Sequence, residues 1–83
     1  MGEVIVVFKI MPDSPDSCGA VKAALEKLKP NRLEEEPLAF GLSFFKFTKL
    51  VPDEGGHIDK LEEQLARVKG VQNVENIMTS RSL

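Results

Sequence analysis

Apolar residues dominate the first segment of the chain, and their pattern predicts a β-strand over residues 3–11. β-branched and aromatic side chains fill this segment, and Pro12-Asp13, which follows it, is expected to end the strand. Successive side chains of a strand point to opposite faces. Here both faces are largely apolar, with Val4, Val6, Phe8 and Ile10 on one and Ile5, Val7, Lys9 and Met11 on the other. Such a strand belongs at the centre of a sheet.

The pattern then changes to the periodicity of a helix. Ser14-Pro15 suits a helix start, because serine can cap the first turn and proline lacks only an N–H that the first turn does not use. Apolar residues follow at spacings of three, four and three, which places them on one helical face: Cys18, Val21, Leu25 and Leu28. Pro30 is expected to end the helix.

The second half of the chain repeats this order. Residues 32–38 predict a weaker strand, because the run Glu34-Glu35-Glu36 and Pro37 suit a solvated sheet edge. A strong strand is predicted from Phe40 to Val51, with Phe45, Phe47 and Val51 on one face, and a loop at 52–56 follows it. The remaining elements are a helix from His57 to Lys69, a left-handed cap at Gly70 and a polar edge strand from Val71 to Ser80.

The two halves correspond at a fixed offset. The apolar stripe of the first helix matches residues 40 positions further on, namely Ile58, Leu61, Leu65 and Val68. Two β-α-β units of this kind favour one antiparallel sheet with both helices on the same side. We therefore predict an α+β fold, the ferredoxin-like βαββαβ sandwich with a four-stranded sheet. Its usual strand order puts the first and third strands in the centre, where the apolar strands are needed.

Composition bounds the class of protein. A chain of 83 residues with 42% hydrophobic and 29% charged residues is expected to form one globular domain, 1–83. A net charge of −2 gives no general attraction to nucleic acid. The single Cys18 cannot form an internal disulfide, so a reducing, cytoplasmic setting is expected. No segment suggests a membrane span or a signal peptide.

The residues that could carry catalysis are few. His57 is the only histidine and no partner for it is evident from the pattern, so we expect it to be exposed in the first turn of its helix. Cys18 lies on an apolar stripe and is expected to be a small core residue rather than a nucleophile. We expect no enzyme chemistry, no metal, no cofactor and no small-molecule substrate of the chain's own.

Two kinds of binding module remain open. RNA-recognition domains share this layout and place aromatic residues on their central strands, as Phe8 and the run 40–47 do here. The alternation, however, turns Phe8, Phe45 and Phe47 toward the core. The opposite face of the sheet would carry a rather apolar set that suits contact with another protein: Ile5, Val7, Lys9, Leu42, Phe44, Lys46 and Thr48.

The segment Glu36-Pro37-Leu38-Ala39-Phe40-Gly41-Leu42 resembles the archaeal elongation factor 1-beta family. The likeness extends over nearly the whole chain, including residues 6–16, the loop Asp53-Glu54-Gly55-Gly56 and the stretch 70–75. Members of this family are ferredoxin-like guanine-nucleotide exchange factors. They bind the GTPase that delivers aminoacyl-tRNA, elongation factor 1-alpha, and disturb the magnesium and phosphate side of its nucleotide site. The resemblance implies that this exchange involves no covalent chemistry and that the factor itself binds neither nucleic acid nor a membrane.

The resemblance also implies which residues contact the GTPase. An aromatic residue at the position of Phe40, next to Gly41, wedges into a pocket of the partner in that family. Eukaryotic relatives place a lysine next to last in the chain, aimed at the magnesium site. Here the last residues are Arg81, Ser82 and Leu83, so Ser82 occupies that position and Arg81 is the nearest cation. Arginine offers the same charge in a different shape.

Overall fold

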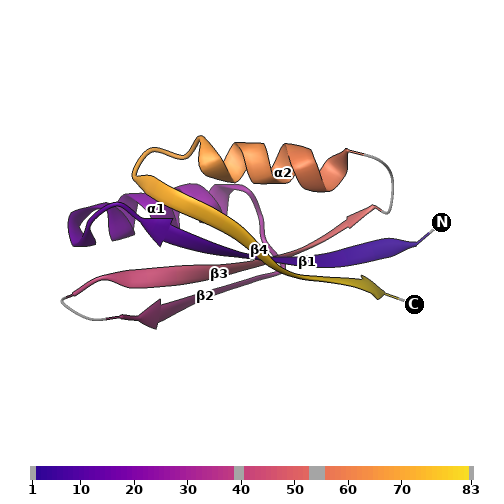
Figure 1. Ribbon diagram of the computed structural model, residues 1–83, viewed down its shortest axis with the longest axis horizontal. Coiled ribbons are helices and arrows are strands. Elements are labelled where there is room, and N and C mark those ends of the chain that lie inside the picture. The colour runs from indigo at the N-terminus through magenta and orange to yellow at the C-terminus, as the bar shows by residue number, and fades with distance from the viewer. Residues whose placement is uncertain (1, 39–40, 53–55, 83) are drawn as a thin grey trace.

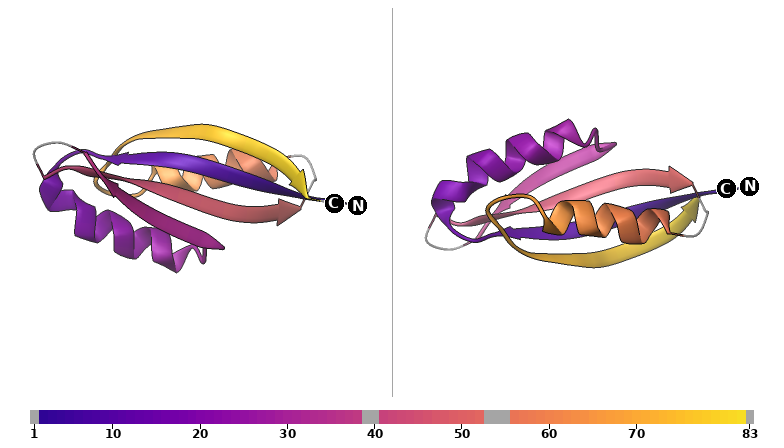
Figure 2. Two further views of the ribbon diagram at one scale, coloured as in Figure 1. Left: turned by 90° about the horizontal axis from the view of Figure 1, so that it is seen from below. Right: turned by 90° about the horizontal axis from the view of Figure 1, so that it is seen from above.

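The computed structural model describes residues 2–38, 41–52 and 56–82. Its elements follow the order β1 (Glu3–Pro12), a 3-10 turn (Pro15–Ser17), α1 (Cys18–Lys27), β2 (Arg32–Pro37), β3 (Ser43–Pro52), α2 (His57–Ala66) and β4 (Val71–Ser82). The strands form one antiparallel sheet in the order β2-β3-β1-β4, and both helices cover the same side of it (Figures 1 and 2). This is the predicted ferredoxin-like sandwich.

The two apolar strands occupy the centre of the sheet, as predicted. β1 pairs with β3 on one side, where Phe8 lies opposite Phe47, and with β4 on the other. β2 pairs only with β3 and forms one edge, and its row of glutamates suits that place because edge strands face solvent. β4 forms the other edge.

One hydrophobic core lies between the sheet and the helices. The side chains predicted to face the helices are buried: Val4, Val6, Phe8 and Ile10 from β1 and Phe45, Phe47 and Val51 from β3. On the opposite face of the sheet, Val7 is buried as well. The helices contribute Val21, Leu25, Leu61 and Leu65, and Cys18, Leu28, Ile58 and Val68 pack around them half-buried. The 40-residue offset of the sequence is therefore the spacing between two equivalent helix faces.

The first helix is shorter than predicted at both ends. Ser14 makes no capping bond to the backbone; its Oγ lies 3.1 Å from Ser17 Oγ, and a 3-10 turn precedes α1. At the other end α1 stops at Lys27, before Pro30, because the chain turns through Lys29, which has a φ of 54°. The Lys49 ammonium donates to the Leu28 carbonyl at this end over 2.8 Å.

Three other predicted boundaries were wrong by two or three residues. α2 ends at Ala66 rather than Lys69, and a turn leads to Gly70, whose φ is positive as predicted. β3 begins at Ser43 rather than at Phe40, because Gly41 lies in a turn. β4 continues to Ser82 instead of ending at Ser80. Within the described ranges, no helix has the length and apolar character needed to cross a membrane.

Candidate functional site

The connection between β2 and β3 carries the first predicted contact residues. Gly41 has a φ of 78°, a conformation that favours glycine, and the Leu38 N–H donates to the Leu42 carbonyl over 2.7 Å across the turn. Phe40 and Ala39 lie outside the described residues. Leu38, which is 42% exposed, adds a large apolar side chain at the same place.

The second predicted contact region lies in the last part of β4. Arg81 pairs with Val4 and Ser82 pairs with Glu3, so these two residues belong to a strand and not to a frayed tail. Leu83 lies outside the described residues. Because the backbone of Arg81 and Ser82 is held by the sheet, the position of this end relative to β1 is fixed.

The structure places the two predicted contact regions at opposite ends of the molecule. The molecule is 43 Å long and about 20 Å across, with the strands running along its length (Figure 1). Pro37 and Ser43 pair beside the Gly41 turn, whereas Glu3 pairs with both Pro52 and Ser82 at the far end. A single partner that touches both regions must therefore be a macromolecule.

The sheet face away from the helices joins these two ends. Lys9 and Lys46 are neighbours at its centre and both are half-buried. The Lys46 ammonium lies 3.2 Å from a Glu36 oxygen, and the Lys9 ammonium lies 4.8 Å from the centre of the Phe44 ring. Each lysine thus has an interaction partner, Lys46 in an ion pair and Lys9 in a cation–π contact.

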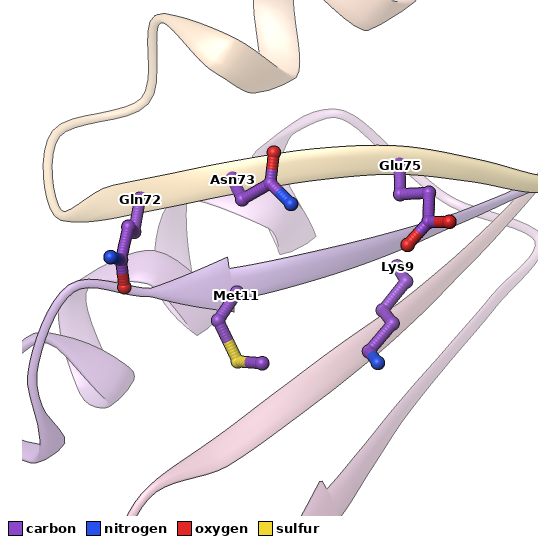
Figure 3. Close-up of a pocket in the computed structure, with 5 residues that line it drawn as sticks. All are labelled: Lys9, Met11, Gln72, Asn73 and Glu75. Atoms are coloured by element: carbon purple, nitrogen blue, oxygen red, sulfur yellow. The ribbon is translucent and has the colours of Figure 1, made fainter.

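An open pocket of about 470 Å³ lies on this face between β1 and β4. Figure 3 shows its lining, with Lys9 and Met11 from β1 and Gln72, Asn73 and Glu75 from β4. The Lys9 ammonium points away from the Glu75 carboxylate (Figure 3). The lining offers amide groups, a thioether and one charge of each sign.

The two residues considered for catalysis, His57 and Cys18, lie on different helices. His57 is exposed at the first turn of α2, as predicted. Cys18 is half-buried against the core, with Sγ 3.9 Å from the Ser14 carbonyl. Among the residues that the structure describes, no three His, Cys, Asp or Glu side chains gather in a group that could hold a metal ion.

Sequence reasoning missed two exposed apolar residues that bear on the site. Ile77 is 44% exposed and Met78 is 48% exposed on β4, a strand whose composition predicts a polar edge. Their exposure follows from a shift of register between β4 and β1, which brings Val7 opposite Met78 but Phe8 opposite Asn76. No pattern in the sequence marks such a bulge.

A ferredoxin-like domain with two predicted contact regions and exposed apolar side chains on its open sheet face has the character of a protein-binding module. The family model of the EF-1 guanine nucleotide exchange domain matches residues 5–81. Elongation factor 1-beta of Methanosphaerula palustris is 42% identical over 78 residues, covering 90% of this chain and 92% of the relative. The corresponding protein of Methanobrevibacter smithii is 39% identical, and the match covers 98% of this chain and 98% of the relative. That of Thermoplasma volcanium is 36% identical, and the match covers 93% of this chain and 97% of the relative.

The chain therefore belongs to the EF-1 guanine nucleotide exchange domain family. The relatives named elongation factor 1-beta that it matches are mostly archaeal. Its role is guanine-nucleotide exchange in translation elongation. The RNA-binding alternative is not favoured, because Phe8, Phe45 and Phe47, which would have to stack on bases, are fully buried under the helices.

Proposed function

We propose that this chain, as a single exchange domain, accelerates the release of GDP from elongation factor 1-alpha by direct contact. Membership of the exchange-domain family, over residues 5–81, carries this proposal. Exchange requires no bond to be made or broken. The factor has to bind the nucleotide-free GTPase more tightly than the GDP-bound form, because a ligand shifts an equilibrium only by its differential affinity.

The contacts we propose are Phe40 and Gly41 at one end of the domain and Arg81, Ser82 and Leu83 at the other. An aromatic residue beside a turn presents a large apolar anchor with few rotatable bonds, the kind of residue that dominates binding energy at interfaces. Arg81 supplies the positive charge near the magnesium and phosphate side of the partner's site, where a cation competes for the same carboxylates and phosphates. The placement of the two regions at opposite ends of the sheet supports a partner of protein size.

The test is the release of a fluorescent GDP analogue from purified elongation factor 1-alpha of the same organism. We expect substoichiometric amounts of this chain to accelerate release with many turnovers, because the factor is not consumed. A release rate independent of the chain, with a folded chain and a GTPase that binds nucleotide, would refute the proposed function.

A further inference from the structure

The open face of the sheet, away from the helices, is hollowed along most of β1, from Met11 to Ile5. The first hollow includes Met11 and Lys9, as described above. A second, of about 450 Å³, is lined by Val7 together with residues of β2, β3 and β4, and a third, of about 180 Å³, includes Ile5. Four open-face residues of β1 thus line three hollows in sequence, beginning near the Gly41 end with Met11 and Lys9 and continuing through Val7 to Ile5.

Two irregularities in β4 build the outer walls of two of these hollows. The register with β1 shifts between Met11 and Pro12 and again between Val7 and Phe8, leaving Gln72 and Ile77 as extra residues of β4. In a regular strand, neighbouring side chains point to opposite faces. Here Gln72 and Asn73 line the same hollow, and so do Ile77 and Met78. β-bulges re-aim side chains in this way.

The result is an apolar surface where a free edge strand would be expected to be polar. Met78 and Ile77 stand about half exposed beside Val7, with Thr48 on the neighbouring strand, and the rest of the lining is charged: Arg32, Glu34 and Lys46. The helix side of the molecule is different, because its outward residues are mostly charged: Lys22, Glu26, Lys27, Asp59, Lys60 and Glu63. Exposed apolar side chains gathered on one face mark an interaction surface.

We propose that this open face lies against the elongation GTPase and forms the middle of one continuous contact surface between the Gly41 turn and the end of β4. The inference rests on the proposed function, in which one partner contacts both ends. Among the described residues, the open face is the one of the two joining faces that carries large apolar side chains along its length, from Leu38 beside the turn through Met78 near the middle to Ile5 and Leu50 toward the far end.

Two other occupants fit less well. Strands of this length and spacing give an open face on the order of 600 Å², which is below the roughly 800 Å² that each partner contributes to a standard interface, so pairing of two copies through this face alone would be weak. Nucleic acid would need unpaired cations, whereas Lys46 is paired with Glu36 and Lys9 lies over Phe44. A protein that also covers the two ends supplies the missing area.

The test compares one substitution on each face. Met78→Glu places a carboxylate on the open face, and Ala23→Glu places the same charge on the exposed side of α1, one turn before Lys27. We expect Met78→Glu to raise the dissociation constant for nucleotide-free elongation factor 1-alpha about tenfold or more, because an interface that buries an unpaired carboxylate loses affinity. Ala23→Glu should stay within about twofold, as surface substitutions outside an interface do.

A second open-face substitution, Ser80→Glu, guards against a folding defect of the first, since Ser80 is exposed and pairs with Ile5. Circular dichroism and thermal unfolding check each variant. If both open-face variants fold and bind like the unsubstituted chain, which itself accelerates GDP release, the inference is wrong and the proposed function stands. If the unsubstituted chain neither binds elongation factor 1-alpha nor accelerates GDP release, the proposed function is wrong, and the inference that rests on it is wrong with it. Sedimentation showing a dimer that Met78→Glu dissociates would assign the face to a second copy and overturn the inference.

Discussion

Gly70 shows how one residue can connect elements that are distant in the sequence. Its φ is 95°, and its carbonyl accepts a hydrogen bond from the Asp13 N–H over 2.7 Å. A Cβ at this position would lie 3.0 Å from the Cβ of Ser17 and 3.2 Å from a methyl group of Val21. The sequence predicts the positive φ, because glycine follows a helix, but the close approach to α1 depends on tertiary structure and could not be read from the local pattern.

Gly70→Ala should therefore lower the free energy of unfolding by roughly 1–3 kcal/mol, from backbone strain and a side-chain clash together. Urea unfolding followed by circular dichroism measures this. The matched control is Gly19→Ala in α1, where an added Cβ meets no atom within 4 Å and alanine favours the helix by roughly 0.5–1 kcal/mol. Equal stability of the two variants would contradict this account of Gly70.

Phe40→Ala should weaken binding to elongation factor 1-alpha by roughly 2 kcal/mol, as the loss of an aromatic anchor does at an interface. The catalysed rate of GDP release should fall with it, while the thermal unfolding of the chain changes little. Titration of labelled GTPase gives the affinity, and Phe40→Leu should retain part of it. An unchanged affinity for Phe40→Ala would remove the anchor from the proposed function without affecting the family assignment.

At the scale of elements, apolar patterning was the most reliable guide. β1 was predicted in the centre because both of its faces are largely apolar, and β3 because it is the other strongly apolar strand. Both helix faces were predicted from the spacing of their apolar residues. The errors lie where local preference competes with pairing. β4 extends to Ser82 because β1 offers it partners down to Glu3, and its bulges depend on how two strands twist together. Neither is a property of a single segment.

The end of α1 gives a prediction at this scale. Lys49 comes from β3, and its ammonium donates to the Leu28 carbonyl, one of the groups that a helix leaves without an internal partner at its carboxyl end. Lys49→Met keeps most of the apolar stem and removes this bond. We expect a loss of about 1 kcal/mol in the free energy of unfolding.

The control for this substitution is Lys69→Met, which removes a lysine that is exposed in the turn before β4. It should change stability by less than about 0.5 kcal/mol, the usual limit for surface positions. Urea unfolding of both variants in one buffer makes the comparison. A loss of similar size in both would mean that net charge, and not the bond to α1, sets the effect.

The whole molecule is a rod with a proposed contact region at each end. Such regions in one rigid body should contribute independently to binding, because they share no side chain and are separated by most of the 43 Å length. This arrangement was accessible from the sequence only in part. The resemblance pointed to both regions, and the strand order then determined how far apart they are.

We predict that Phe40→Ala and Arg81→Ala weaken binding additively, with the double variant within about 0.5 kcal/mol of the sum of the single losses. A double-mutant cycle on the affinity for nucleotide-free elongation factor 1-alpha tests this. Arg81→Lys serves as the charge-conserving control. A coupling energy well above 1 kcal/mol would show that the domain or its partner changes shape when either end binds.

Glu3 pairs with both Pro52 and Ser82, so the start of β1 and the end of β4 lie side by side (Figure 1). An affinity tag at either terminus would therefore stand next to the same proposed contact region. Attachment through Ala23 on the helix side, after substitution by cysteine, would leave the open face and both ends free. For surface-based binding measurements, the choice of anchoring point should decide whether the partner can dock along the full length of the domain.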